Sequence, residues 1–335
     1  MNESYPSAVS GPRTRDLLGD AERRLDRAGV VSPRFDAESI LGFVLGVPRT
    51  KLFLHDNVER TQASVFERLL IRRISREPLQ HIIGTAGFRT LTLSVGKGVF
   101  VPRPETEVVV EAALRELRLL PTDDNGRRVV IDMCSGSGAI ALSLAIEEPG
   151  TDVIAVELSD DAVPWLQANV DNYAEALGTV GSRVVVVHGD VTNIGTGLLN
   201  HLIFQVAMVV SNPPYIPERM VPRDPEVAVH DPNLALYGGS DGLNVVRQVA
   251  AASARMLPDG GVLIVEHADV QGPDAQNGVP RLLTDAGWDD VIDLQDQAGR
   301  PRFTRATRTA NTSPDVASRL GPEVTWHKNG PGEPQ

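Results

Sequence analysis

The chain has 335 residues, of which 41% are hydrophobic, which is enough to form two domains with a sizeable core. A formal net charge of −12 argues against extended binding to a nucleic-acid backbone, which depends on many Lys and Arg contacts. The single cysteine, Cys134, excludes internal disulfides and cysteine-based zinc clusters. The first residues contain no apolar signal segment, and no run approaches membrane-spanning length. We therefore expect a cytoplasmic protein that binds neither nucleic acid directly nor a membrane.

The first 80 residues have the pattern of a helical domain. Leu18, Ala21, Leu25 and Ala28 recur at helical spacing, and Gly29 is a natural stop. The first 90 residues contain 14 Lys and Arg against 11 Asp and Glu, whereas the remainder contains 18 against 33. Solvated helix faces explain this asymmetry slightly better than a surface for docking a partner.

Residues 81–103 change to β character and are expected to form a hairpin linker. Residues 90–95 alternate between polar and apolar side chains, and Gly96 and Gly98 interrupt the pattern. The stretch from Val101 to Glu107 contains proline and acidic residues suited to the first turn of a helix. A helix is therefore predicted to begin there.

Strands and helices alternate through the next predicted domain, residues 104–306. Apolar strand patterns occur at 128–132, 153–156, 183–187, 206–211 and 262–265. Such alternation predicts a mostly parallel sheet with helices on both faces. Residues 307–335 are rich in Thr, Asn, Ser, Gly and Pro and are expected to be a disordered tail.

A turn rich in glycine follows the first strand of this predicted sheet. The pattern at 128–132 leads into Met133–Gly138 and then into a helix. Gly136 and Gly138 allow tight turning and close approach of a ligand to the backbone. The next strand ends in Glu157, whose carboxylate can accept hydrogen bonds from both ribose hydroxyls. Because the third glycine of a dinucleotide fingerprint is missing, a nucleoside crevice is favoured.

A rigid corner, Asn212, Pro213, Pro214 and Tyr215, follows the strand pattern that ends near residue 210. Open α/β sheets bind ligands at this end of their strands. Two successive prolines remove two amide donors and stiffen the backbone, so the Asn212 side chain and nearby carbonyls are held outward as acceptors. Such a corner can bind a planar NH2 group. The seven histidines show no metal-ligand spacing, so no metal is expected.

Several further motifs occur in the order found in a known family. They are residues 101–107, 210–216, 235–239, 241–243, and Gly299-Arg300 with Arg302. From about residue 12 to residue 306 the chain resembles the peptide chain release factor glutamine methyltransferase family. The resemblance implies an α/β, Rossmann-like class I methyltransferase domain. A small helical N-terminal domain, residues 1–80, would recognise the substrate and be joined to it by the β-hairpin.

The resemblance also implies the activity and its residues. A monomer would transfer a methyl group from S-adenosylmethionine to the side-chain amide nitrogen of the glutamine in the Gly-Gly-Gln motif of class 1 peptide chain release factors. The glutamine would be held by Asn212, Pro213, Pro214 and Tyr215. The cofactor would be bound by Asp132, Cys134, Ser135, Gly136, Ser137, Gly138, Glu157, Asp190, Val191 and Asn212.

The corner suits this chemistry because an amide nitrogen is a poor nucleophile, its lone pair being delocalised into the carbonyl. If the Asn212 side-chain oxygen and the Pro213 carbonyl each accept one N–H, the nitrogen gains electron density and can be aimed at the methyl group. Fixed geometry of this kind can be worth about 7–11 kcal/mol in favourable cases. The methylated nitrogen is very acidic, so no strong base is needed. Tyr215 either stacks on the amide or is an ordinary buried aromatic.

Four positions depart from the family pattern. Cys134 stands where methyltransferases generally prefer glycine, and Glu157 stands where aspartate is usual. His81 replaces a tyrosine of many members, and Asp231-Pro232 replaces Glu-Pro. The two acidic substitutions keep the charge.

Three other functions stay open at this point: methylation of the exocyclic amine of adenine in nucleic acid, glutamine methylation of a ribosomal protein, and binding of S-adenosylmethionine by an interaction factor. An adenine methyltransferase must extract a base from a stacked strand and neutralise phosphates, which the acidic balance disfavours. A purely binding role would not require the acceptor corner.

Overall fold

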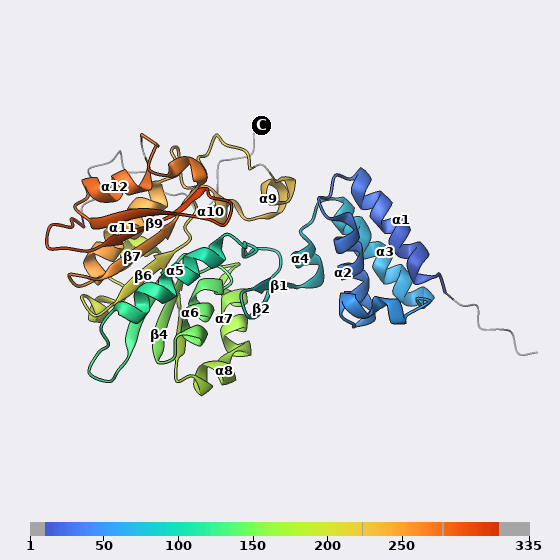
Figure 1. Cartoon of the computed structure of the whole chain (residues 1–335), viewed down its shortest axis with the longest axis horizontal. Coiled ribbons are helices and arrows are strands. Elements are labelled where there is room, and N and C mark those ends of the chain that lie inside the picture. The colour runs from blue at the N-terminus through green and yellow to red at the C-terminus, as the bar shows by residue number, and fades with distance from the viewer. Residues whose placement is uncertain (1–10, 223, 277, 315–335) are drawn as a thin grey trace, which may run out of the picture. The chain divides into compact units, whose positions relative to one another are not determined.

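The computed structural model describes residues 11–222, 224–276 and 278–314, which divide into two compact units. The helical unit comprises residues 11–85 together with helix α9 (Pro225–His230), and the sheet unit comprises residues 86–222 and 231–314 (Figure 1). In the part of the chain that the structure describes, no helix is both long and apolar enough to cross a membrane.

The helical unit packs short helices around one apolar core. Its elements are α1 (Thr14–Arg27), α2 (Pro33–Leu45), the 3-10 helix η1 (Arg49–Leu54), α3 (Arg60–Ile74), α4 (Leu79–Ile83) and α9. Leu25, Ile40, Phe66 and Leu70 are fully buried in this core. The helical periodicity predicted for the first 80 residues is confirmed, because the residues that recur every three or four positions are those that face this core.

A two-stranded sheet follows along the chain, formed by β1 (Thr85–Phe88) and β2 (Leu91–Ser94). Phe88, Leu91 and Leu93 are buried in a core of the sheet unit. The predicted alternation is therefore confirmed, because every second residue of these strands faces inward.

The sheet unit contains a seven-stranded sheet with the order β5-β4-β3-β6-β7-β9-β8. Its strands are β3 (Arg128–Met133), β4 (Thr151–Glu157), β5 (Arg183–His188), β6 (Met208–Ser211), β7 (Val262–Glu266), β8 (Asp289–Gln295) and β9 (Pro301–Thr307). The first five strands in the order pair in parallel, whereas β9 pairs antiparallel with both of its neighbours. The predicted mostly parallel sheet is confirmed.

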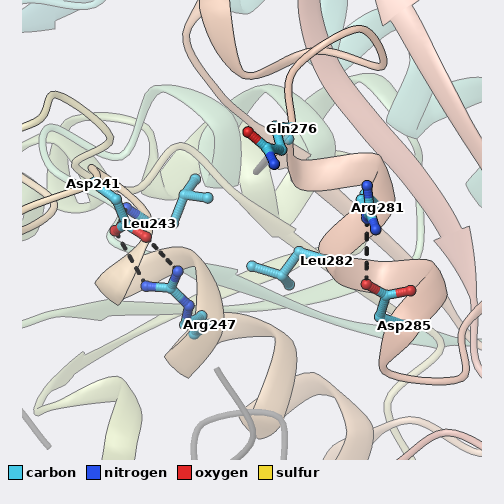
Figure 2. A pocket seen from close by; sticks show the side chains of 8 residues that line it. Asp241, Leu243, Arg247, Gln276, Arg281, Leu282 and Asp285 are labelled. Carbon is cyan, nitrogen blue, oxygen red and sulfur yellow. Dashed lines mark hydrogen bonds and ion pairs between the residues drawn. The ribbon is translucent and has the colours of Figure 1, made fainter. Parts of the chain in front are cut away.

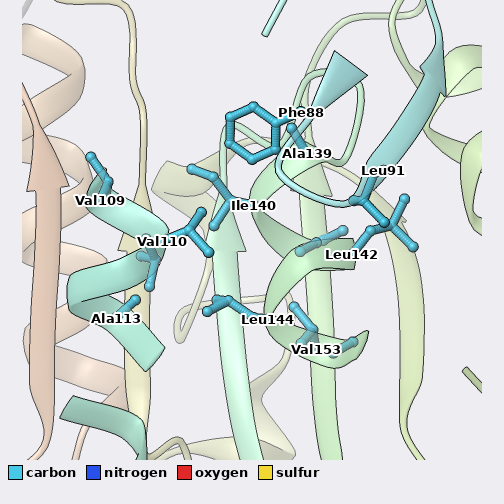
Figure 3. Packing of buried hydrophobic residues seen from close by; sticks show 14 of the residues in the cluster. Phe88, Leu91, Val109, Val110, Ala113, Ala139, Ile140, Leu142, Leu144 and Val153 are labelled. Atoms are coloured by element: carbon cyan, nitrogen blue, oxygen red, sulfur yellow. The ribbon is translucent and has the colours of Figure 1, made fainter. Parts of the chain in front are cut away.

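Helices cover both faces of this sheet, as expected of alternating strands and helices. The elements are α5 (Thr106–Leu119), α6 (Ala139–Glu147), α7 (Val163–Asn172), α8 (Ala174–Thr179), α10 (Asn233–Leu236), α11 (Asn244–Met256), α12 (Val279–Asp285), η2 (Val191–Asn193), η3 (Asn200–Leu202) and η4 (Asp269–Gln271). On one face α5 and α6 pack against the hairpin, with Phe88, Val110 and Ile140 close together (Figure 3). On the other face α11 and α12 form the second core. The sheet is thus buried on both sides, which fits its continuous apolar strands.

The C-terminal stretch differs from its prediction as a disordered tail from residue 307. Thr307 ends β9, the Arg308 N–H donates to the Gly261 carbonyl at 2.8 Å, and the Ser313 N–H donates to the Ala286 carbonyl at 3.0 Å. These backbone bonds hold residues 308–313 against the sheet unit, so the predicted boundary moves past Ser313. Residues 315–335 lie outside the described residues.

Candidate active site

The glycine turn and the Asn-Pro-Pro-Tyr corner lie side by side at the carboxyl ends of β3 and β6. These two strands are neighbours in the sheet. The strands β4 and β5, which follow β3 in the chain, lie on one side of the pair, and the strands that follow β6 lie on the other side. The Ser211 hydroxyl donates to the Met133 carbonyl at 2.6 Å, which ties the two strand ends together. Such a switch point is where doubly wound sheets open a crevice for ligands.

Three residues of the glycine turn have a left-handed backbone. Cys134 has φ 64°, Gly136 has φ 54° and Gly138 has φ 84°. A Cβ on Gly138 would lie 2.6 Å from Leu166, so only glycine fits there. A residue other than glycine, such as Cys134, pays about 1–3 kcal/mol for a left-handed backbone. This cost explains why methyltransferases that resemble this chain prefer glycine at the position. Burial raises the pKa of the Cys134 thiol, so this side chain is a neutral thiol rather than a nucleophile.

Asp132 and Ser135 stiffen the turn from inside. The Ser135 hydroxyl donates to the Asp132 carbonyl at 2.8 Å, and the Asp132 carboxyl accepts from the Ala141 N–H at 3.1 Å. Burial raises the pKa of Asp132 to about 7. The Ser137 carbonyl accepts from the Asn169 amide at 2.9 Å. The Ser135 hydroxyl thus holds the turn together, whereas Ser137 contributes to it through its backbone carbonyl.

Glu157 lies against the turn at the end of β4. Its carboxylate accepts the Gly136 N–H at 2.8 Å and the Ser159 N–H at 2.8 Å, and the residue is 9% exposed. Burial raises its pKa. Each carboxylate oxygen has a further lone pair, so the group can still accept from ligand hydroxyls. Apart from the residues next to Gly136 in the chain, no described heavy atom lies within 4 Å of the position a Cβ would take on Gly136, so open space faces the backbone there.

Asp190 and Val191 follow β5 and lie next to the end of β4. The Gly189 N–H donates to the Glu157 carbonyl at 2.9 Å, which brings the loop next to Glu157. The Asp190 carboxylate accepts the Thr192 N–H at 2.8 Å and Val191 is buried. Together with Asn212 after β6, the predicted cofactor residues thus come from the carboxyl ends of four adjacent strands, β5, β4, β3 and β6.

At the corner, both prolines are buried and the Asn212 side chain is half-buried. The Asn212 Nδ2 donates to the Thr106 hydroxyl at 3.3 Å, which leaves Oδ1 as the free acceptor. The Tyr215 hydroxyl donates to Glu266 at 3.3 Å, and the Gln271 side chain donates to the Tyr215 carbonyl at 3.0 Å. Burial raises the pKa of Tyr215, so its hydroxyl stays protonated.

The segment 235–243 wraps the corner from outside. Ile216 pairs with Tyr237 in a parallel bridge. A Cβ on Gly238 would lie 2.5 Å from the Pro214 carbonyl, and one on Gly242 would lie 2.3 Å from the Tyr215 carbonyl. The glycines of this motif are therefore required by close backbone approach, a role that pattern reasoning did not assign.

Thr106, Glu266 and Gln271 are further site residues that sequence reasoning missed. The sequence pattern around Thr106 predicts only a helix start. The one available signal was that Thr106 lies within the motif at 101–107 that the family shares.

A separate cavity of about 320 Å³ lies beside α11 and α12, as Figure 2 shows. It is lined by Asp241, Leu243, Arg247, Gln276, Gly278, Arg281, Leu282 and Asp285. The charges pair with one another, Arg247 with Asp241 and Arg281 with Asp285. None of these lining residues belongs to the glycine turn or to the corner, so the cavity is not the site described above.

Comparisons with known proteins agree with this geometry. A model of the PrmC N-terminal domain matches residues 16–84, and a model of the methyltransferase small domain matches residues 114–224. The release factor glutamine methyltransferase of Mycolicibacterium smegmatis is 43% identical over 300 residues, covering 90% of this chain and 99% of that protein. The protein of the same name from Streptomyces coelicolor is 44% identical over 296 residues, covering 87% and 96%.

A solved structure of a release factor-specific protein-(glutamine-N5) methyltransferase from Alicyclobacillus acidocaldarius is 27% identical and covers 64% of this chain and 98% of that chain. Its TM-score of 0.35 adds nothing to the assignment. The two bacterial relatives match over almost their whole lengths at 43% and 44% identity. The chain therefore belongs to the release factor glutamine methyltransferase family.

Proposed function

We propose that this enzyme methylates the side-chain amide nitrogen of the glutamine in the Gly-Gly-Gln motif of class 1 release factors, with S-adenosylmethionine as methyl donor. The observation that carries the proposal is the orientation of Asn212. Its Nδ2 donates to Thr106, so its Oδ1 is left to accept an N–H from a planar amide. We also infer that the enzyme acts as a monomer in the cytoplasm, since its single cysteine suits a reducing compartment.

The residues around the glycine turn fit the cofactor. When bound, S-adenosylmethionine supplies an electrophilic methyl group on a sulfonium. The open backbone at Gly136 and the remaining lone pairs of Glu157 suit a ribose. Asp190 and Val191 would flank the adenine, and Asp132 and Cys134 to Gly138 would shape the turn beneath the rest of the molecule.

The corner would align the acceptor amide. Asn212 Oδ1 and the Pro213 carbonyl would each accept one N–H of the substrate glutamine, which raises the electron density on nitrogen and fixes its direction. Such fixed geometry can contribute about 7–11 kcal/mol to the lowering of the barrier. Because the nitrogen loses its proton readily once it is methylated, the corner needs acceptors and no base. Tyr215, held at its hydroxyl and its carbonyl, would form one wall against the flat amide.

A methyl-transfer assay with isotope-labelled S-adenosylmethionine would test this function. Purified release factor, naked DNA and ribosomes are offered in parallel, and the labelled product is digested and located by mass spectrometry. We expect label only on release factor, at the glutamine of its Gly-Gly-Gln motif. A release factor with that glutamine changed to alanine is the matched control and should accept no methyl group. Label on DNA, on a ribosomal protein, or at another release-factor residue would contradict the proposal.

A further inference from the structure

The buried carboxylate of Glu266 contacts the Asn-Pro-Pro-Tyr corner but has no role in the function proposed above. Glu266 ends β7 and is 1% exposed. Its Oε1 accepts from the Tyr215 hydroxyl at 3.3 Å, whereas its buried Oε2 has no hydrogen-bond partner within the part of the chain that the structure describes. An isolated buried carboxylate is costly, and a buried acceptor without a donor is rare in folded proteins.

Thr106 supplies the missing donor. It is the first residue of α5, is 4% exposed, and accepts from Asn212 Nδ2 at 3.3 Å. Its own hydroxyl proton is therefore left for another acceptor. Of the groups around Glu266, the Thr106 hydroxyl is the one that most opposes the rise in pKa that burial causes, ahead of the Arg302 guanidinium. Oε2 has no formed hydrogen bond with any described residue, so the carboxyl or the Thr106 hydroxyl has to rotate before Thr106 can donate to it.

We propose that Glu266 and Thr106 are positioning residues for methyl transfer: the Glu266 carboxylate accepts from the hydroxyls of Tyr215 and Thr106 and thereby keeps Asn212 Oδ1 free for the substrate amide. The roles of Glu266 and Thr106 rest on the proposed function, because they concern the alignment of the same substrate amide.

The reason is the direction of the hydrogen bonds. Above about pH 7, where Glu266 is mostly ionised, its carboxylate only accepts, so Thr106 must donate to it and can offer Asn212 only a lone pair. Asn212 must then present its NH2 to Thr106 and its oxygen to the crevice. If residue 266 could donate, Thr106 could turn its proton toward Asn212, and the amide of Asn212 could flip. The flipped amide would meet the substrate NH2 with donors instead of an acceptor.

Kinetics of four variants would test the proposal: Thr106→Val, Thr106→Ser, Glu266→Gln and the matched control Thr151→Val. Thr151 is a buried threonine of β4 whose hydroxyl has no partner among the described residues, so its loss should leave kcat unchanged. We expect Thr106→Val and Glu266→Gln each to lower kcat for release factor by about 10- to 100-fold, the scale of a small misplacement of a reacting group. S-adenosylmethionine affinity should stay within about twofold, and Thr106→Ser should restore most of the rate.

The double variant Thr106→Val with Glu266→Gln should be no slower than the slower single variant, because both changes break one chain of hydrogen bonds. Normal kcat in Thr106→Val or Glu266→Gln would overturn the proposal. So would an equal loss of cofactor affinity, since a general collapse of the site would cause it. If wild-type enzyme fails to methylate release factor, the proposed function itself fails, which is a distinguishable result.

Discussion

Two glutamates, the half-buried Glu226 of the helical unit and the buried Glu266 of the sheet unit, have opposite environments. In the helical unit, Glu226 on α9 accepts from Arg73 at 2.8 Å and from Arg76 at 2.6 Å. Burial alone would raise its pKa, but the hydrogen bonds from the two arginines lower it to about 2. In the sheet unit, Glu266 faces the hydroxyls of Tyr215 and Thr106, and burial raises its pKa to about 7.

The difference shows that Glu226 holds two helices together, whereas Glu266 orients the hydrogen bonds of its neighbours. A carboxylate between two guanidiniums stays charged at all ordinary pH values and holds α9 to α3. A carboxylate among hydroxyls is held at a cost in stability, since its charge is poorly compensated. We infer that this cost is tolerated at Glu266 because an obligate acceptor is needed beneath Asn212.

The largest expected effect is the pH dependence of stability caused by Glu266. Its carboxyl has a folded-state pKa of about 7 against an ordinary value of 4.5, so folding favours the protonated form. The stabilisation of the folded protein by protonated Glu266 is complete below about pH 4.5 and is lost as the pH rises through 7. The shift corresponds to about 3 kcal/mol. Urea unfolding of wild type and Glu266→Gln at pH 5 and pH 8 would measure it.

Wild type should lose about 2.5 kcal/mol relative to Glu266→Gln between these two pH values, because part of the titration of the unfolded state falls below pH 5. The neighbours of Glu266, namely the charged Glu105 and Arg302 and the neutral Tyr215, are the same in both proteins, so their effects cancel to first order. An identical pH dependence in both proteins would show that the carboxyl titrates normally.

Glu226→Ala should destabilise the helical unit by about 1.5–3 kcal/mol, the range for hydrogen bonds to charged groups. Arg73 keeps its bond to Asp36 at 2.7 Å, which limits the loss. Trp165 and Trp288, the tryptophans among the described residues, lie in the sheet unit, so their fluorescence reports on that unit. The variant should lower the midpoint seen by far-ultraviolet circular dichroism more than the midpoint seen by fluorescence. Equal shifts in both signals would contradict a local tie.

The corner and the glycine turn could be predicted from the sequence because each is a short local pattern. Two prolines after a strand restrict the backbone in any context, and Gly136 and Gly138 after another strand signal a tight turn. Parallel strands then bring their carboxyl ends to one edge, so the crevice followed from the order of strands.

The residues beneath the corner could not be predicted in this way. Thr106 and Glu266 are far apart in the chain and meet only because α5 packs over β7. Thr106 has the features of any helix start, and Glu266 those of a strand end. The partners of Glu226, Arg73 on α3 and Arg76 just beyond its end, are likewise far away in sequence. Periodicity reveals which face of an element is buried, but not which polar groups meet there.

Glu157 is a third buried carboxylate and differs from both others, because it accepts from backbone amides. Glu157→Ala should weaken S-adenosylmethionine binding by about 1–3 kcal/mol through lost bonds to the ribose. Calorimetric titration measures this directly, with Glu175→Ala, an exposed glutamate of α8, as the control. Unchanged affinity in Glu157→Ala would remove Glu157 from the cofactor site.

The most direct test of the acceptor corner is the single-turnover rate of methyl transfer to release factor by Asn212→Ala at saturating S-adenosylmethionine. We predict a fall of about 100-fold or more with a much smaller loss of cofactor affinity, the pattern of an interaction made mainly in the transition state. Asn212→Asp, which still accepts hydrogen bonds, should keep part of the rate. A wild-type rate in Asn212→Ala would contradict the assignment of Asn212 as the residue that aligns the amide.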